Sequence, residues 1–163
     1  KENNVKTDIV VMIQGDEPLI EPSFIDKLIS CYKKLKVKPD ILVPHHKILR
    51  VDNKSIVKMV FSTNKRILYF SRSTIPYNKN SEEIYIYKHL SVILFSKNVL
   101  NQYRKLKKSP LEKSEDIELL RALENNLYIS TLEIKGSSFS IDIRDDYLKA
   151  KSIIENDKYR KLY

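Results

Sequence analysis

An unbroken apolar run near the start of the chain constrains the fold most strongly. Residues 9–13 read Ile-Val-Val-Met-Ile, and the turn-forming sequence Gln-Gly-Asp-Glu-Pro follows at 14–18. Apolar, β-branched runs are typical of strands that are buried on both faces of a parallel sheet. Apolar residues at helical spacing then indicate a helix over 23–36, and a second apolar run predicts a strand at 41–43. Strand, helix and strand in this order form the repeating unit of α/β proteins.

The rest of the chain continues this pattern without repeats or low-complexity linkers. Two β-prone runs, 56–61 and 67–71, flank a polar turn and predict a hairpin. The other expected elements are a loop at 73–83, a strand at 84–95, a helix at 98–107, a helix or helix pair at 109–123, a strand at 127–134, an extended piece at 138–141 and a helix at 144–155. We therefore expect one domain over residues 1–163, with a Rossmann-like three-layer α/β/α fold and a mixed, mainly parallel sheet.

Two of the expected helices carry capping signals at their starts. Ser23 is followed by Asp26, and Ser109 is followed by Pro110 and Glu112. In a capping box the serine side chain accepts from the backbone amide three residues on, and the acidic side chain there reaches back to the serine amide. Both serines are therefore expected to begin helices, with Pro110 at the first helical position.

The counts of glycine and cysteine exclude several kinds of site. Gly15 and Gly136 are the only glycines of the chain. A Walker phosphate loop and a dinucleotide fingerprint both need several glycines at fixed spacing, so neither is present. Cys31 is the only cysteine, which excludes an intramolecular disulfide and a cysteine-rich zinc site. The composition is that of a domain from a reducing compartment, and we expect a cytoplasmic protein.

The charge balance is strongly basic, because 30 Lys and Arg stand against 21 Asp and Glu. The lysines are grouped at expected helix ends and near the C-terminus, where they suit the helix dipole and stay solvated. No nucleic-acid-binding motif accompanies them, so we expect no nucleic-acid partner and keep a nucleic-acid-binding domain only as the weakest alternative. The longest apolar run, at 9–13, is too short to cross a bilayer, and no membrane insertion is expected.

Two aspartates follow expected strands at positions that suit a metal ion. Asp16 comes after the strand at 9–13, and Asp142 follows the extended piece at 138–141. Open α/β sheets bind their ligands outside the carboxyl ends of the strands. Two carboxylates at one sheet edge are hard oxygen ligands for Mg²⁺, and substrate phosphates complete its coordination. Either aspartate taken alone fits a turn or a helix cap better.

Five motifs in a fixed order favour the metal-binding interpretation of Asp16 and Asp142 over the turn or helix cap. They are Ile-Gln-Gly-Asp-Glu-Pro-Leu-Ile at 13–20, Leu-Tyr-Phe-Ser-Arg-Ser-Thr-Ile-Pro-Tyr at 68–77, Lys-His-Leu at 88–90, Ser-Pro-Leu-Glu at 109–112 with Glu115, Glu118 and Leu-Arg-Ala-Leu-Glu at 120–124, and Ile-Asp at 141–142 with Asp145 and Asp146. In this order they resemble the motifs of cytidylyltransferases that activate acidic sugars, above all the CMP-Kdo synthetase (3-deoxy-manno-octulosonate cytidylyltransferase) family. The likeness extends from Asp8 to about Asn156.

The resemblance implies an enzyme that activates an acidic 2-keto sugar for cell-surface polysaccharide synthesis, such as that of lipopolysaccharide. In this family the anomeric hydroxyl of the sugar attacks the α-phosphate of CTP, and CMP-sugar and pyrophosphate are formed. Asp16 and Asp142 would then be catalytic and would hold Mg²⁺ between the nucleotide and the sugar, so that positioning and charge neutralisation carry the catalysis. The hairpin would be a dimerisation and sugar-site insertion of a homodimer.

The resemblance also implies substrate-binding roles for four residues. Gln14 would help to seat the nucleotide or the sugar. Arg72 would meet the negative charge of the sugar, because a guanidinium binds a carboxylate through two parallel hydrogen bonds. His89 and Glu118 would bond to sugar hydroxyls.

Structural alternatives exist for these side chains. Arg72 would otherwise be a surface charge after a strand, and His89 a core histidine. Glu118 would otherwise pair with Arg121 at i,i+3 spacing. The histidines at 45 and 46 follow an expected strand without carboxylates or cysteines in ligand register, and we interpret them as structural or solvent-facing.

Two departures from the family pattern leave alternatives open. Residues 1–7 contain no basic loop, so we expect the chain to lack the family's first strand and triphosphate-binding loop and to be a poor catalyst alone. Ile93 and Leu119 stand where the family usually has Tyr and Gln, which favours an acceptor less polar than Kdo. The alternatives are a CMP-neuraminate- or legionaminate-type synthetase and a catalytically impaired binding protein of the same fold.

Overall fold

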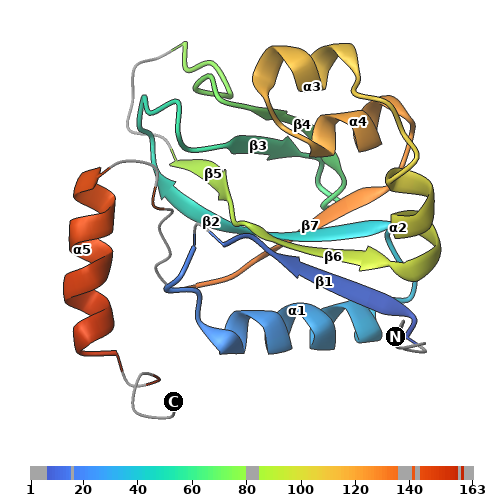
Figure 1. Cartoon of the computed structure of the whole chain (residues 1–163). Coiled ribbons are helices and arrows are strands. Elements are labelled where there is room, and N and C mark those ends of the chain that lie inside the picture. Colours follow the sequence, from blue (N-terminus) through green and yellow to red (C-terminus); the bar gives the residue numbers. More distant parts are fainter. Residues whose placement is uncertain are drawn as a thin grey trace.

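A seven-stranded sheet forms the centre of the molecule (Figure 1). The computed structural model describes residues 7–15, 17–79, 85–135, 141, 144–157 and 159. Its strands are β1 (Ile9–Ile13), β2 (Ile41–Leu49), β3 (Lys58–Phe61), β4 (Ile67–Ser71), β5 (Tyr85–His89), β6 (Val92–Ser96) and β7 (Ile129–Glu133). Its helices are α1 (Pro22–Lys34), α2 (Lys97–Tyr103), α3 (Pro110–Glu115), α4 (Leu119–Glu124) and α5 (Arg144–Glu155). The strand order is β1-β6-β2-β5-β3-β4, and β7 pairs with β2.

Most neighbouring strands of the described sheet run antiparallel, so the expectation of a mainly parallel sheet is wrong. β1 and β2 run in the same direction on either side of α1 in the chain, as the strand–helix–strand pattern predicts, but β6 lies between them and is antiparallel to both. Among the described strands only β2 and β7 form a parallel pair. Local apolar runs cannot reveal this, because the strand that separates β1 from β2 comes much later in the chain. The predicted β3–β4 hairpin is confirmed, and it extends the main sheet through β5.

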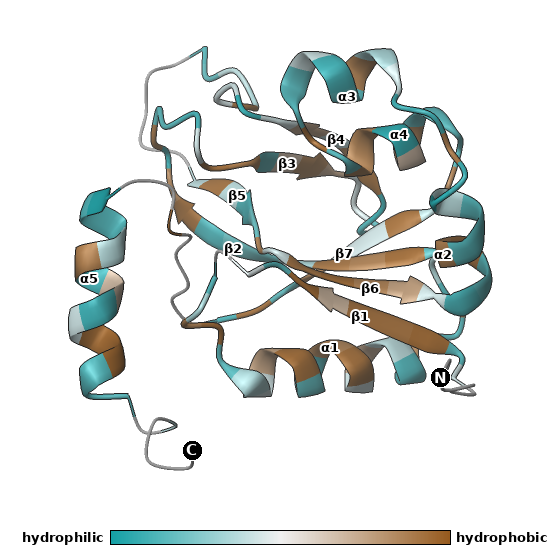
Figure 2. Cartoon of the chain, viewed as in Figure 1, coloured by the Kyte–Doolittle hydropathy of each residue, from teal (hydrophilic) through white to brown (hydrophobic). Residues whose placement is uncertain are grey.

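Apolar side chains cover both faces of the sheet and produce the three layers. α1 lies on one face, where Leu28 and Leu42 belong to the same buried cluster. The other face carries α3 and α4, and there Ile41, Val43 and Leu120 share the largest cluster. Successive side chains of a strand point to opposite faces, so β2 supplies both layers. Figure 2 shows mainly apolar residues along β1 and β6 and a mixture of polar and apolar residues on the helices.

The strand expected at 84–95 is two strands, β5 and β6, that pair with β2 one after the other. The register shifts at Leu90 and Ser91, where the chain bends. The strand expected at 41–43 continues to Leu49, because β5 and β7 both supply hydrogen-bond partners along it. β2 is therefore the central strand of the sheet.

Of the two capping signals, one is confirmed and one is wrong. Ser109 Oγ accepts from the Glu112 amide, and the Glu112 carboxylate accepts from the Ser109 amide, so α3 begins with the expected capping box. α1 begins at Pro22 instead of after Ser23, and no side chain caps it. Proline suits the first helical turn because its missing N–H would have no partner there, and the helix therefore starts ahead of the serine.

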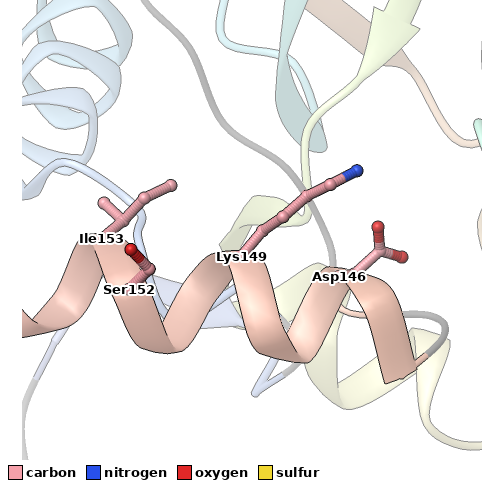
Figure 3. A pocket seen from close by; sticks show the side chains of 4 residues that line it. All are labelled: Asp146, Lys149, Ser152 and Ile153. Atoms are coloured by element: carbon pink, nitrogen blue, oxygen red, sulfur yellow. The ribbon is translucent and has the colours of Figure 1, made fainter.

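α5 confirms the helix expected at 144–155 and stands beside one end of the sheet (Figure 1). Ala150 is buried, whereas Tyr147, Leu148 and Ile153 are about half exposed. Figure 3 shows a pocket along this helix; the residues that line it are Asp146, Lys149, Ser152 and Ile153. None of the residues expected to bind substrate lines this pocket. Within the described parts of the chain, no helix is long and apolar enough to span a membrane.

Candidate active site

The carboxyl end of β1 is joined to the bend between β5 and β6. Gln14 is exposed directly after β1. Its main-chain N–H donates to the Ser91 carbonyl at 3.1 Å. Glu17 is only 2% exposed, and its Oε1 accepts from the Ser91 amide at 3.3 Å. These hydrogen bonds bring the motif at 13–20 and the motif that contains His89 to one place. Sequence reasoning assigned no role to Glu17, because only the fold shows that its carboxylate is buried.

Both aspartates expected to bind Mg²⁺, Asp16 and Asp142, lie outside the described residues. Among the residues that the structure does describe, no group of three or more His, Cys, Asp or Glu side chains forms a metal site. The metal-binding role of the two aspartates therefore stays a prediction. It depends on the chemistry of the donor set, since two carboxylates are the hard oxygen ligands that Mg²⁺ prefers.

His89 ends β5 immediately before the bend and is neutral. Its ring packs edge-on against Phe70, with 5.6 Å between the ring centroids. Burial lowers the pKa of His89 to about 4, although the charge of Glu17 opposes this shift. Its buried Nε2 has no hydrogen-bond partner within the described part of the chain. The expected bond from His89 to a sugar hydroxyl stays a prediction.

Arg72 follows β4, and main-chain carbonyl groups hold its guanidinium. Nε donates to the Glu115 carbonyl at 2.9 Å, Nη1 to the Lys54 carbonyl at 3.2 Å and Nη2 to the Asp116 carbonyl at 3.2 Å. The Asp116 carboxylate lies 3.9 Å from Nη2 and is 91% exposed, so this ion pair contributes little. The described residues thus take three of the five guanidinium N–H groups. The expected contact with an anionic sugar stays a prediction.

Glu115, at the end of α3, is a member of the site to which sequence reasoning assigned no role. Its Oε1 accepts from Ser71 Oγ at 2.6 Å, and its Oε2 accepts from the Arg72 amide at 2.8 Å. The carboxylate of Glu115 therefore joins the end of α3 to the end of β4. Glu115 belongs to one of the five motifs, but only the fold shows that its partners lie on a distant strand.

Glu118 is exposed at the start of α4. Its main-chain carbonyl accepts from the Tyr103 hydroxyl at 2.8 Å. The alternative pairing with Arg121 is wrong, because Arg121 forms its ion pair with Glu112, at 2.5 Å. A bend at Asp116 separates α3 from α4, and this lets Arg121 face Glu112. The expected role of Glu118 toward a sugar hydroxyl stays a prediction.

Ile93 and Leu119 are core residues. Each is 3% exposed, and both belong to the largest buried cluster. They pack between β6 and α4 and present no apolar surface to a ligand in this structure. Their burial therefore does not support the interpretation that they favour a less polar sugar.

His45 and His46 lie inside β2 and are buried, so they do not follow the strand and do not face solvent. His45 Nδ1 lies 2.7 Å from Thr131 Oγ1. Because that hydroxyl donates its own hydrogen to the Val43 carbonyl, Nδ1 of His45 is the donor in this pair. Burial lowers the pKa of His45 to about 4 and also lowers that of His46. The solvent-facing interpretation is therefore wrong, and the burial of both histidines fits the structural one.

Mild acid is expected to destabilise the protein, because burial lowers the pKa of all three histidines. His45 has a pKa of about 4 when folded against 6.5 when exposed, so the unfolded chain binds its proton more readily. The folded state is therefore most stable above about pH 6.5 and loses roughly 3 kcal/mol through His45 as the pH falls toward 4. We expect His45→Gln to lessen the fall in the free energy of urea unfolding between about pH 7 and about pH 4.5. An identical fall in the free energy of unfolding of His45→Gln would contradict the assignment of this acid sensitivity to His45.

The seven-stranded sheet with helices on both faces defines an α/β protein. A solved inositol-1-phosphate CTP transferase from T. maritima has a TM-score of 0.55 at 19% identity and covers 93% of this chain and 58% of its own; this likeness shows the fold alone. A solved CMP:2-keto-3-deoxy-manno-octonic acid synthetase complexed with CTP has a TM-score of 0.83 at 30% identity, over 93% of this chain and 64% of that chain.

A family model described as cytidylyltransferase matches residues 1–134, and the chain therefore belongs to the cytidylyltransferase family. Two of its relatives are 3-deoxy-manno-octulosonate cytidylyltransferases. The protein of Rickettsia rickettsii is 40% identical over 94% of this chain, and that of Fusobacterium nucleatum is 35% identical over 93%. The chain spans 62% and 65% of the lengths of these two relatives.

Proposed function

We propose that this protein transfers CMP from CTP to 3-deoxy-manno-octulosonate, with release of pyrophosphate, for the synthesis of a cell-surface polysaccharide. The observation that carries the proposal is the 35–40% identity, over nearly the whole chain, to relatives named for this activity. The hydrogen bonds of Gln14 and Glu17 to Ser91 also support it, because they bring the motif at 13–20 close to the motif at 88–90, at the carboxyl end of β1. Ligands of α/β sheets bind at such an edge.

In the proposed site, Asp16 and Asp142 hold Mg²⁺, which when bound neutralises phosphate charge. Gln14 is exposed, precedes Asp16 by two residues in the sequence, and is suited to seat the nucleotide or the sugar. Main-chain contacts hold Arg72 in place, and its remaining N–H groups are suited to the sugar carboxylate. In this proposal Arg72 supplies the positive charge that meets the acid group of the sugar.

Two further residues are proposed to bind sugar hydroxyls. The neutral His89 offers one ring nitrogen as hydrogen-bond partner, and the exposed carboxylate of Glu118 accepts hydrogen bonds. We also propose a homodimer formed through the β3–β4 hairpin. β4 is an edge strand of the sheet, and its Leu68 is 59% exposed, which supports an interface there.

The test is a coupled pyrophosphate-release assay with CTP, Mg²⁺ and a panel of acidic sugars. We expect release that requires both CTP and 3-deoxy-manno-octulosonate and that is much slower with UTP or GTP. A clear preference for neuraminate or legionaminate would replace the proposed sugar by the alternative one. Sugar binding without pyrophosphate release, in a protein that spans the full length of its relatives, would identify a binding protein instead.

The 163-residue chain by itself is expected to be a poor catalyst, because these residues have only two glycines and contain no basic triphosphate-binding loop of the kind that the family resemblance implies. A hybrid that adds the part of the Rickettsia rickettsii relative unmatched by this chain should release pyrophosphate much faster in the same assay. The matched control is the same hybrid with Asp142→Asn, which should remain slow. Equal turnover by the chain and the unmodified hybrid would contradict the prediction.

A further inference from the structure

Lys58, the first residue of β3, is a fully buried lysine. It is 0% exposed, and its Nζ donates to the carbonyl groups of Asn53 at 2.7 Å, Ile56 at 2.8 Å and Arg72. The main chain thus uses all three N–H groups of the ammonium. No carboxylate of the described residues lies within ion-pair distance of Nζ.

A buried ammonium without an adjacent carboxylate is costly, so its presence needs a reason other than packing. Burial lowers the pKa of Lys58, and the charge of Asp52 opposes that shift. An apolar side chain of similar length would fill the same space without this cost. What the lysine adds is three hydrogen bonds that join the loop at 53–56 to the end of β4.

The same hydrogen bonds reach Arg72 both directly and through the loop at 53–56. The loop at 53–56 includes Lys54, whose carbonyl accepts from Arg72 Nη1. Lys58 also holds the carbonyl of Arg72, while Glu115 holds its amide. The backbone of Arg72 is therefore fixed on both sides, and one of the groups that orient its guanidinium belongs to the loop that Lys58 holds.

We infer that Lys58 is a positioning residue: its buried ammonium fixes the guanidinium of Arg72 in the orientation that binds the carboxylate of the substrate. The inference rests on the proposed function, because that function makes Arg72 the group that meets the acidic sugar. Lys58 itself does not touch the substrate. It acts through the Arg72 carbonyl and through the loop that includes Lys54.

The experiment compares the unmodified chain with Lys58→Met, which keeps the apolar stem and removes the ammonium. One measurement is the dissociation constant for 3-deoxy-manno-octulosonate by calorimetry. The other is the hydrogen exchange of the Arg72 Nε–H, followed by NMR, which reports the bond from Nε to the Glu115 carbonyl. Lys113→Met is the matched control, because it removes one lysine charge from the exposed side of α3.

We expect Lys58→Met to raise the dissociation constant roughly ten- to a hundredfold, the range for losing hydrogen bonds to a charged group, and to speed exchange of the Nε–H. Lys113→Met should change neither. Unchanged exchange in Lys58→Met overturns the inference, even if the sugar binds more weakly. Faster exchange with an unchanged dissociation constant also overturns it.

If the unmodified chain binds no 3-deoxy-manno-octulosonate, the proposed substrate fails, and exchange at Nε alone then decides whether Lys58 positions Arg72. If Lys58→Met does not fold, Lys58→Gln takes its place, because it keeps one hydrogen-bond donor group on a shorter side chain. The same two measurements and the same control apply to that variant. An Nε–H as protected as in the unmodified chain would again overturn the inference.

Discussion

In a protein that spans the full length of its relatives, Asp16→Asn is expected to lower kcat at least ~10²-fold. This is the scale for losing one preorganised charge-stabilising group. In the sequence, Asp16 comes three residues after Ile13, the last residue of β1. Asparagine keeps the turn-forming properties of aspartate but loses the negative charge that a Mg²⁺ ligand supplies. The free energy of unfolding should therefore change much less than the rate.

Pyrophosphate release across a range of Mg²⁺ concentrations measures this effect, and urea unfolding measures stability. Asp26→Asn is the matched control, because it makes the same chemical change on the exposed side of α1. That control should keep both activity and stability. Near-normal activity of Asp16→Asn at ordinary Mg²⁺ concentrations would assign Asp16 to the turn instead.

Arg121→Met is expected to lower the free energy of unfolding by about 3–5 kcal/mol, the cost of leaving a buried charge without its partner. Glu112 is 3% exposed and meets Arg121 at 2.5 Å. Arg121 also donates to the Leu106 carbonyl at 3.3 Å and lies over the ring of Tyr103, 5.2 Å from its centroid. Methionine fills similar space but supplies none of these polar contacts.

The control for Arg121→Met is Asp116→Asn, which removes the exposed 3.9 Å ion pair with Arg72. Exposed pairs contribute about 0–1 kcal/mol, so urea unfolding should separate the two variants clearly. Glu112→Gln combined with Arg121→Met should recover part of the loss, because no buried carboxylate then remains unpaired. If Arg121→Met lowered the free energy of unfolding no more than Asp116→Asn, the buried Glu112 carboxylate would not need Arg121 for its stabilisation.

The positions of most elements could be predicted from sequence because their signals are local. The apolar run at 9–13, the hairpin and the capping box at Ser109 each depend on residues a few positions apart, and the structure has all three. The helix expected at 144–155 is also present. α1 begins one residue ahead of its expected start for an equally local reason, since Pro22 and Ser23 both signal a helix start and the helix begins at the proline.

The candidate site was only partly predictable, because its contacts join distant segments. The motifs singled out Gln14, Arg72 and His89, but no spacing shows that Glu17 reaches Ser91 or that Glu115 holds the end of β4. Lys58 appears in the sequence as an ordinary strand residue, and its burial depends on a loop and on a neighbouring strand. The metal ligands Asp16 and Asp142 stay predictions.

Local sequence signals are enough to place most strands and helices, to identify the five motifs and to exclude glycine-rich phosphate loops from these residues. Periodicity, caps and composition act over a few residues, so they can be read without the fold. The folded chain is needed to see that β6 runs between β1 and β2, that burial lowers the pKa of His45, and that carbonyl groups hold Arg72. Strand pairing and burial depend on which distant segments pack together, and the free energy of that packing belongs to the whole chain.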